Sequence, residues 1–120
     1  MRIPILKQGE VLIASVQSAL SDRDLDLLRE ELSQKVEGLR IRGVVIDVMA
    51  LDVIDSFATR TLRGIAKASQ LRGARTVIVG IQPDVAFAMV QLGLELEGVP
   101  TALDLDEALA LLAGPASGGE

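Results

Sequence analysis

The sequence predicts an α/β fold, with a single domain built on a mixed central sheet of four to five strands and about four helices packed on it. Short β-branched runs alternate with segments whose apolar residues recur every three or four positions, the order typical of strands joined by helical crossovers. The 120 residues, 49% of them apolar, are enough to bury one core. We expect one domain over residues 1–113 and a flexible, Gly-rich tail over residues 114–120.

The first strands differ in how they connect. Ile3–Leu6 and Val11–Val16 have strand composition and are separated by a turn at Gln8 and Gly9, which predicts an antiparallel hairpin. Gly43–Val48 is an uninterrupted β-branched run, which is typical of a central strand covered on both faces. The sheet is therefore expected to be mixed.

The first helix has clear signals at both ends. Ser21 and Asp24 have the spacing of a capping box, with Asp in place of the usual Glu. The helix should run to about Val36, and Gly38 fits the residue just past its end. Its apolar residues recur at three and four positions and should form one buried face.

The second helix is predicted from Ser56 to about Leu71, ended by Gly73. One face is apolar and should contact the sheet. The other face carries the basic residues Arg60, Arg63, Lys67 and Arg72. These side chains would contact either water or an acidic partner, and the sequence does not separate the two possibilities.

The last third of the chain predicts two strands, Thr76–Val79 and Val99–Ala102, and two helices. Pro83 fits the first turn of one helix, which should end near Gly93. Asp104 should cap the other, which runs to about Leu112.

Composition excludes much chemistry. The chain has no His and no Cys, which removes imidazole bases, thiol nucleophiles and zinc–thiolate sites. Its net charge of −5 argues against nucleic acid as a partner. The opening MRIPILKQGE lacks the long apolar run of a signal peptide, and no segment is apolar enough to cross a membrane. We expect a cytoplasmic, non-enzymatic protein without catalytic residues, cofactor or metal.

The segment VIDSF, from Val53 to Phe57, lies at the junction between a predicted buried strand and the second helix. Either Asp55 or Ser56 could be the helix cap that satisfies a free N–H group. Ser56 could also accept a phosphoryl group, because a helix N-terminus presents free amides and a positive dipole end that tolerate phosphate. The two interpretations are compatible.

Three aspartates surround this junction: Asp47, Asp52 and Asp55. Their pattern superficially resembles a response-regulator receiver, in which an Asp at a strand end accepts phosphate with a metal ion. The acidic pair and the lysine that such a site needs are missing after the expected neighbouring strands. Solvated loop carboxylates are the better interpretation. The turn Gly80–Pro83 lacks a nucleotide-binding pattern and is interpreted as structural.

Together these residues resemble the STAS domain of anti-anti-sigma factors, in which an Asp-Ser pair at this junction carries the phosphoacceptor serine. The resemblance extends over nearly the whole chain through IPIL, GVVIDV, VIDSFA, LRGARTVIVGIQPDVA and LGLELEGVPTALDLDEAL. Phe57 and Ala58 replace the small residue pair that usually follows the serine in free antagonists. This departure favours the branch of single-domain scaffolds in the bacterial stressosome.

The resemblance implies a role and partners. The protein would be a non-enzymatic scaffold that assembles with a sensor-bearing STAS paralogue, holds a serine protein kinase of the switch-protein type, and is phosphorylated by it under stress. A serine phosphatase would reset the site. Ser56 would be the phosphorylated residue and Thr59 a weaker candidate, while Asp52, Asp55 and Phe57 would contact the kinase. The alternative is a free anti-anti-sigma factor that binds an anti-sigma kinase directly.

Overall fold

The computed structural model describes residues 3–17 and 21–114. The elements follow one another in the order β1 (Ile5–Gln8), β2 (Val11–Ser15), α1 (Asp22–Gly38), β3 (Gly43–Asp47), α2 (Ser56–Leu71), β4 (Arg75–Val79), α3 (Pro83–Gln91), β5 (Thr101–Ala102) and α4 (Leu105–Ala113).

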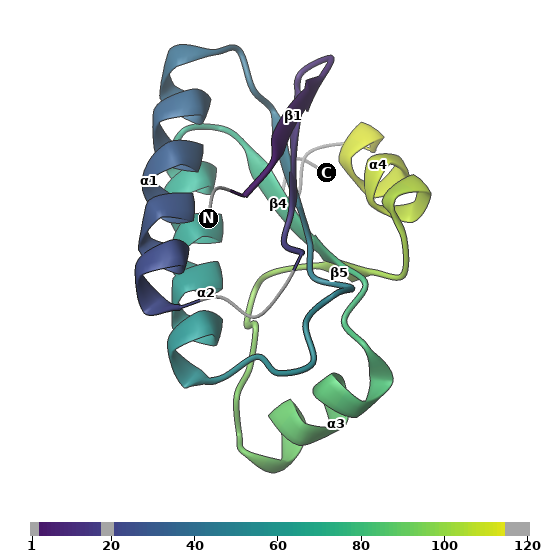
Figure 1. Ribbon diagram of the computed structural model, residues 1–120. Coiled ribbons are helices and arrows are strands. Elements are labelled where there is room, and N and C mark those ends of the chain that lie inside the picture. The colour runs from purple at the N-terminus through teal and green to yellow at the C-terminus, as the bar shows by residue number, and fades with distance from the viewer. Residues whose placement is uncertain (1–2, 18–20, 115–120) are drawn as a thin grey trace.

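The five strands form one sheet in the order β1-β2-β3-β4-β5 (Figure 1). β1 pairs with β2 in antiparallel fashion, and every other neighbouring pair is parallel. The predicted mixed sheet and its α/β class are confirmed within the described residues. The hairpin contributes the antiparallel edge, and connections that contain α1, α2 and α3 join the successive parallel strands from β2 to β5.

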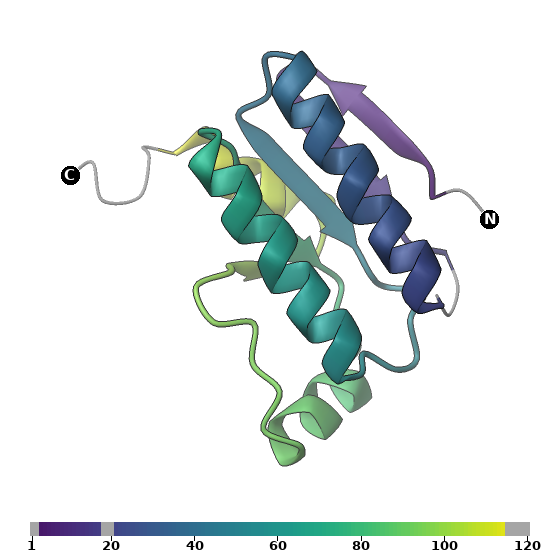
Figure 2. The same cartoon turned by 90° about the vertical axis from the view of Figure 1, so that its left-hand side faces the viewer.

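Helices cover both faces of the sheet. α1 and α2 lie side by side on one face and α4 lies on the other (Figures 1 and 2). Because successive strand residues point to opposite faces, Val44 and Ile46 join the core under α1 and α2, whereas Val45 joins the core under α4. All three side chains are fully buried, which confirms that β3 is a central strand covered on both faces.

Several boundaries differ from the sequence-based expectation. β1 begins at Ile5 and continues to Gln8, because its pairing with β2 extends to the turn and matches Gln8 with Val11. β5 has two residues, since Pro100 before it has no N–H to donate to a ladder. Gly38 is the last residue of α1 and not the residue after it; Leu39 is the C-cap. The expected tail lies outside the described residues from position 115 onward.

The parallel strands β2, β3 and β4 end at the same edge of the sheet, as they must when they run in one direction. The segment after β3 (residues 48–55), the turn after β4 (residues 80–82) and α3 therefore gather at this edge (Figure 1). Ligand and partner sites in open α/β sheets often lie here. Among the described residues, no helix combines the length and apolar character needed to span a membrane.

Candidate functional site

The segment between β3 and α2 has buried anchors and an exposed tip. Leu51 and Ile54 are buried in the core, while Val53 between them is 72% exposed. At its start, the Met49 N–H donates to Asp47 Oδ1 at 2.9 Å, which fixes the turn that leaves the strand. Packing of Leu51 and Ile54 and the bond to Asp47 therefore help to set the path of this segment, and its last residues lead into α2.

α2 begins with Asp55 as its N-cap. Asp55 Oδ1 accepts a hydrogen bond from the Ala58 N–H at 2.8 Å. Ser56 is the first helical residue; it is exposed, and its hydroxyl makes no hydrogen bond within the part of the chain that the structure describes. Of the two capping candidates, Asp55 is thus the cap, and the interpretation of Ser56 as a cap is wrong. The Asp55 carboxylate accepts the hydrogen bond from the Ala58 N–H, and the Ser56 hydroxyl takes no part in the cap.

Thr59, the second hydroxyl near this junction, is in a different environment. Its side chain is 2% exposed, and its Oγ1 donates to the Asp55 carbonyl oxygen at 2.8 Å. Another protein's active site could reach this hydroxyl only if the first turn of α2 opened.

The residues expected to contact a kinase are divided between surface and core. Asp52 and Asp55 are exposed, whereas Phe57 is half-buried and packs against the core under α2. The exposed carboxylates and Ser56 thus share one short segment. Asp47 is tied to Met49, and among residues 3–17 and 21–114 no group of three or more acidic side chains is arranged to hold a metal ion.

Sequence reasoning missed that the turn after β4 supports this segment. Gln82 Nε2 donates to the Met49 carbonyl oxygen at 2.7 Å. Gly80 has φ +81°, and a Cβ built on it would lie 3.0 Å from Met49 Cβ. The close approach needs glycine, and the bond needs the amide of Gln82. The Gly-Ile-Gln-Pro turn was visible in the sequence, but only the fold shows what it contacts.

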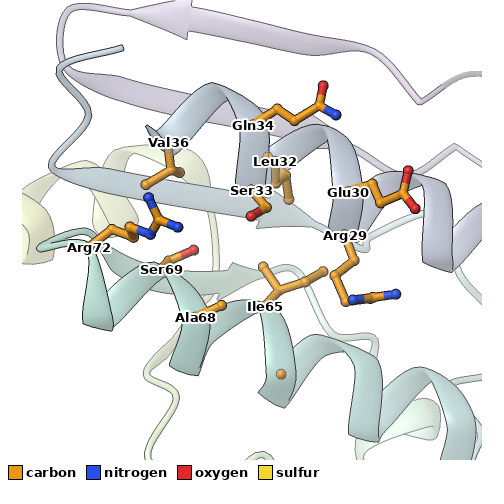
Figure 3. Close-up of a pocket in the computed structure, with 11 residues that line it drawn as sticks. Arg29, Glu30, Leu32, Ser33, Gln34, Val36, Ile65, Ala68, Ser69 and Arg72 are labelled. Carbon is orange, nitrogen blue, oxygen red and sulfur yellow. The ribbon is translucent and has the colours of Figure 1, made fainter. Parts of the chain in front are cut away.

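A groove of about 440 Å³ runs between α1 and α2 (Figure 3). Leu32 and Ile65 point toward each other from the facing helices and form its apolar floor, and Arg29 and Arg72 lie toward its two ends. Arg72 is one of the basic residues that the sequence offered for an acidic partner, but none of the residues predicted at the phosphorylation site or its kinase-contacting surface lines the groove. The groove is therefore separate from the Ser56 junction.

Comparison with known families decides the classification. The STAS domain matches residues 2–108, nearly the whole chain. This chain belongs to the STAS family. The match covers every strand, the Asp55–Ser56 junction and the start of α4. The resemblance to the STAS domain that the sequence indicated is therefore confirmed.

Two solved structures of stressosome proteins are similar to this domain in both sequence and fold. It is 37% identical to a Ser-to-Glu variant of Moorella thermoacetica RsbS, with a TM-score of 0.80 over 93% of this chain and 95% of that one. It is also 37% identical to a chain in a structure of the stressosome, described as a signal integration and transduction hub, with a TM-score of 0.74 over 91% of this chain and 95% of that one.

Among curated sequences, the domain is 27% identical over 81 residues to the RsbT co-antagonist protein RsbRD of Bacillus subtilis. That match covers 68% of this chain and 29% of the relative. The chain thus spans less than a third of the length of RsbRD.

Proposed function

We propose that this STAS domain is a non-enzymatic, phosphorylatable scaffold of a stressosome-type assembly, with Ser56 as its phosphoacceptor. The observation that carries the proposal is the position of Ser56: exposed, first in α2, and not used by the cap that Asp55 supplies. A hydroxyl that the fold does not need can be modified without unfolding the helix.

The chemistry of the position supports a switch. A kinase would transfer the γ-phosphoryl group of ATP to Ser56 Oγ, with release of ADP and the hydroxyl proton. The phosphate would carry close to two negative charges at neutral pH. The free amides and dipole of the α2 N-terminus tolerate this charge, but Asp52 and Asp55 add to it on the same exposed segment. A partner that binds this surface would then face strong negative charge.

This charge gives the direction of the switch. In the resting state the serine protein kinase binds the surface that includes Asp52, Asp55 and the exposed edge of Phe57. Phosphorylation of Ser56 weakens that binding by like-charge repulsion or by desolvation of the phosphate, and the kinase leaves. A serine phosphatase restores the hydroxyl and with it the binding surface.

The proposed assembly partner is a sensor-bearing STAS paralogue. The likeness to RsbS and to a chain of the stressosome, each over more than nine-tenths of this chain, supports a scaffold role. The sequence match to RsbRD, in which this domain corresponds to only part of a longer protein, supports a paralogue with additional domains. Such a complex would work in the cytoplasm.

Reconstitution tests the scaffold. The protein is mixed with its paralogue and its cognate kinase, and the complexes are sized before and after phosphorylation. A scaffold elutes with the paralogue as a large assembly that retains the kinase only while Ser56 is unmodified. If the protein instead stays small and binds the kinase alone, the free anti-anti-sigma alternative holds and the scaffold proposal fails.

A further inference from the structure

A second cavity, of about 520 Å³, lies at the other edge of the molecule from the β1 hairpin. One wall is α2, with Arg63, Lys67 and Gln70, and the opposite wall is the segment 97–100 that leads into β5. Thr76 of β4 lines it from below. Figure 2 shows the segment before β5 rising beside α2. None of the residues of the Ser56 junction lines this cavity.

The short β5 explains why the cavity exists. β4 has five residues, but only Ile78 and Val79 pair with β5. The first three residues of β4 therefore have no partner strand on that side, and the chain from Glu97 to Pro100 passes at a distance from α2. A volume of this size is within the range of small-molecule sites.

Thr76 carries the observation that points to a ligand. It is 4% exposed, and its Oγ1 is the buried side-chain polar atom for which the described residues supply no hydrogen-bond partner. Leaving such a group unpaired costs free energy, and a valine of the same shape would avoid the cost. Thr76 lies beside an open volume, and one staggered step about χ1 moves its hydroxyl to the position that the methyl group or the hydrogen on Cβ now occupies.

The charges around the cavity favour an anion. Arg63 and Lys67 have no carboxylate within ion-pair distance among the described residues, although the whole chain has 17 acidic and 12 basic residues. Arg63 Nη1 is only loosely held, donating to the Glu95 carbonyl oxygen at 3.4 Å. Glu97 is the one acidic residue in the lining.

A third cation, Arg75, lines the cavity but points its guanidinium to the opposite face of the sheet. There its Nη2 donates to the Leu111 carbonyl oxygen of α4 at 2.8 Å. Its charge is therefore not counted in the site, which rests on Arg63 and Lys67.

We propose that this cavity binds a small organic phosphate monoester. Arg63 and Lys67 would pair with the phosphate oxygens, and the Gln70 amide and the Thr76 hydroxyl would donate hydrogen bonds to it. Ala66, Val99 and Pro100 line the remaining surface and would contact the organic part. The proposal concerns binding alone and does not rest on the role of Ser56.

The test uses the isolated, isotope-labelled protein and phenyl phosphate as the probe, followed by backbone amide shifts. Binding predicts saturable shifts centred on Lys67, Gln70, Thr76 and Gly98. Lys67→Gln should weaken the affinity roughly tenfold, the size expected for one charge-assisted hydrogen bond. Thr76→Val should weaken it several-fold while the thermal midpoint of the free protein stays the same or rises.

Arg60→Gln is the matched control, because it removes the same charge from α2 at an exposed residue outside the cavity lining. It should leave the affinity within about twofold of the parent protein, and phenol should give no saturable shifts. The proposal is overturned if the shifts do not saturate, if they centre on the start of α2, or if Arg60→Gln weakens binding as much as Lys67→Gln. Unchanged binding in Thr76→Val would also overturn the role of the hydroxyl.

Discussion

The starts of α1 and α2 each combine a serine and aspartates but use them in opposite ways. At α1 the serine is the cap: Ser21 Oγ accepts from the Asp24 N–H, and Asp24 Oδ2 accepts in return from the Ser21 N–H, both at 3.1 Å. At α2 the aspartate is the cap, and Ser56 stands one position inside the helix without a bond to the described chain.

This contrast separates a structural serine from an available one. A phosphate on Ser21 would break a reciprocal pair of hydrogen bonds, whereas a phosphate on Ser56 would leave the Asp55–Ala58 bond in place. Both serines are exposed, so exposure by itself does not distinguish them. The register of the cap does.

Removing each hydroxyl in turn should have the largest effect. Ser56→Ala is expected to abolish phosphorylation by the cognate kinase, while Ser21→Ala leaves it intact, because the Ser21 hydroxyl is used by the α1 cap and the Ser56 hydroxyl is not used by the α2 cap. Mass spectrometry of the kinase-treated proteins is the measurement. Phosphate on Thr59 in the parent protein, with none on Ser56, would contradict the assignment.

Stability should follow the reverse order. Ser21→Ala and Asp55→Ala each remove a cap and should lower the free energy of unfolding by about 0.5–2 kcal/mol. Ser56→Ala removes no bond and should change it by less than about 0.5 kcal/mol, the usual range for surface substitutions. Urea unfolding of the three variants decides this, and a loss in Ser56→Ala equal to that in Asp55→Ala would restore Ser56 as part of the cap.

The two helix starts also differ in what supports them from outside. Gln82→Ala removes the bond to the Met49 carbonyl and should destabilise the protein by about 0.5–1.5 kcal/mol. Hydrogen exchange should accelerate over residues 49–56 and not around Ser21. Gln91→Ala is the control, because Gln91 is an exposed glutamine at the other end of α3, the helix that Gln82 precedes. It should leave hydrogen exchange unchanged both over residues 49–56 and around Ser21. Equal protection in Gln82→Ala and the parent would show that packing of Leu51 and Ile54 suffices.

The smallest effect should appear in the pH dependence of the α1 cap. The pKa of Asp24 lies below its ordinary value of 3.8. The main cause is the hydrogen bond from the Ser21 backbone, and the second is the hydrogen bond with the Ser21 side chain. A depressed pKa in the folded state stabilises the protein above the ordinary value, and this contribution is lost as the pH falls through the folded pKa. Asp24→Asn should therefore flatten the pH dependence of urea unfolding below about pH 4. An unchanged slope would mean that the carboxylate does not stabilise the cap.

The sequence predicted the order of elements well because its signals are local. Alternating β-branched and helical segments, the Ser21 capping box, Pro83 and Asp104 each act within a few residues, and the structure has them where expected. It could not separate Asp55 from Ser56 as the N-cap of α2, since both are good capping residues. The choice depends on how the chain enters the helix after Ile54, which is buried in the core.

Contacts between distant segments were beyond reach of the sequence. Thr59 was a weaker phosphorylation candidate in the sequence, and its burial could not be seen there because it depends on how α2 lies on the sheet. The surroundings of Thr76 Oγ1, which has no partner among the described residues, are formed by α2 and by the segment before β5, both distant from it along the chain. The role of Gln82 depends on the parallel pairing of β3 and β4, which brings two turns to one edge.

The contact between Gly80 and Met49 has a consequence for protein engineering and for divergence. With 3.0 Å between Met49 Cβ and a Cβ built at position 80, and with Gln82 bonded to the same Met49 backbone, neither segment can be exchanged alone. A transplant of the Ser56 segment into another STAS domain should carry residues 80–82 with it. Natural variation at Met49 should likewise be paired with variation in the Gly-Ile-Gln turn.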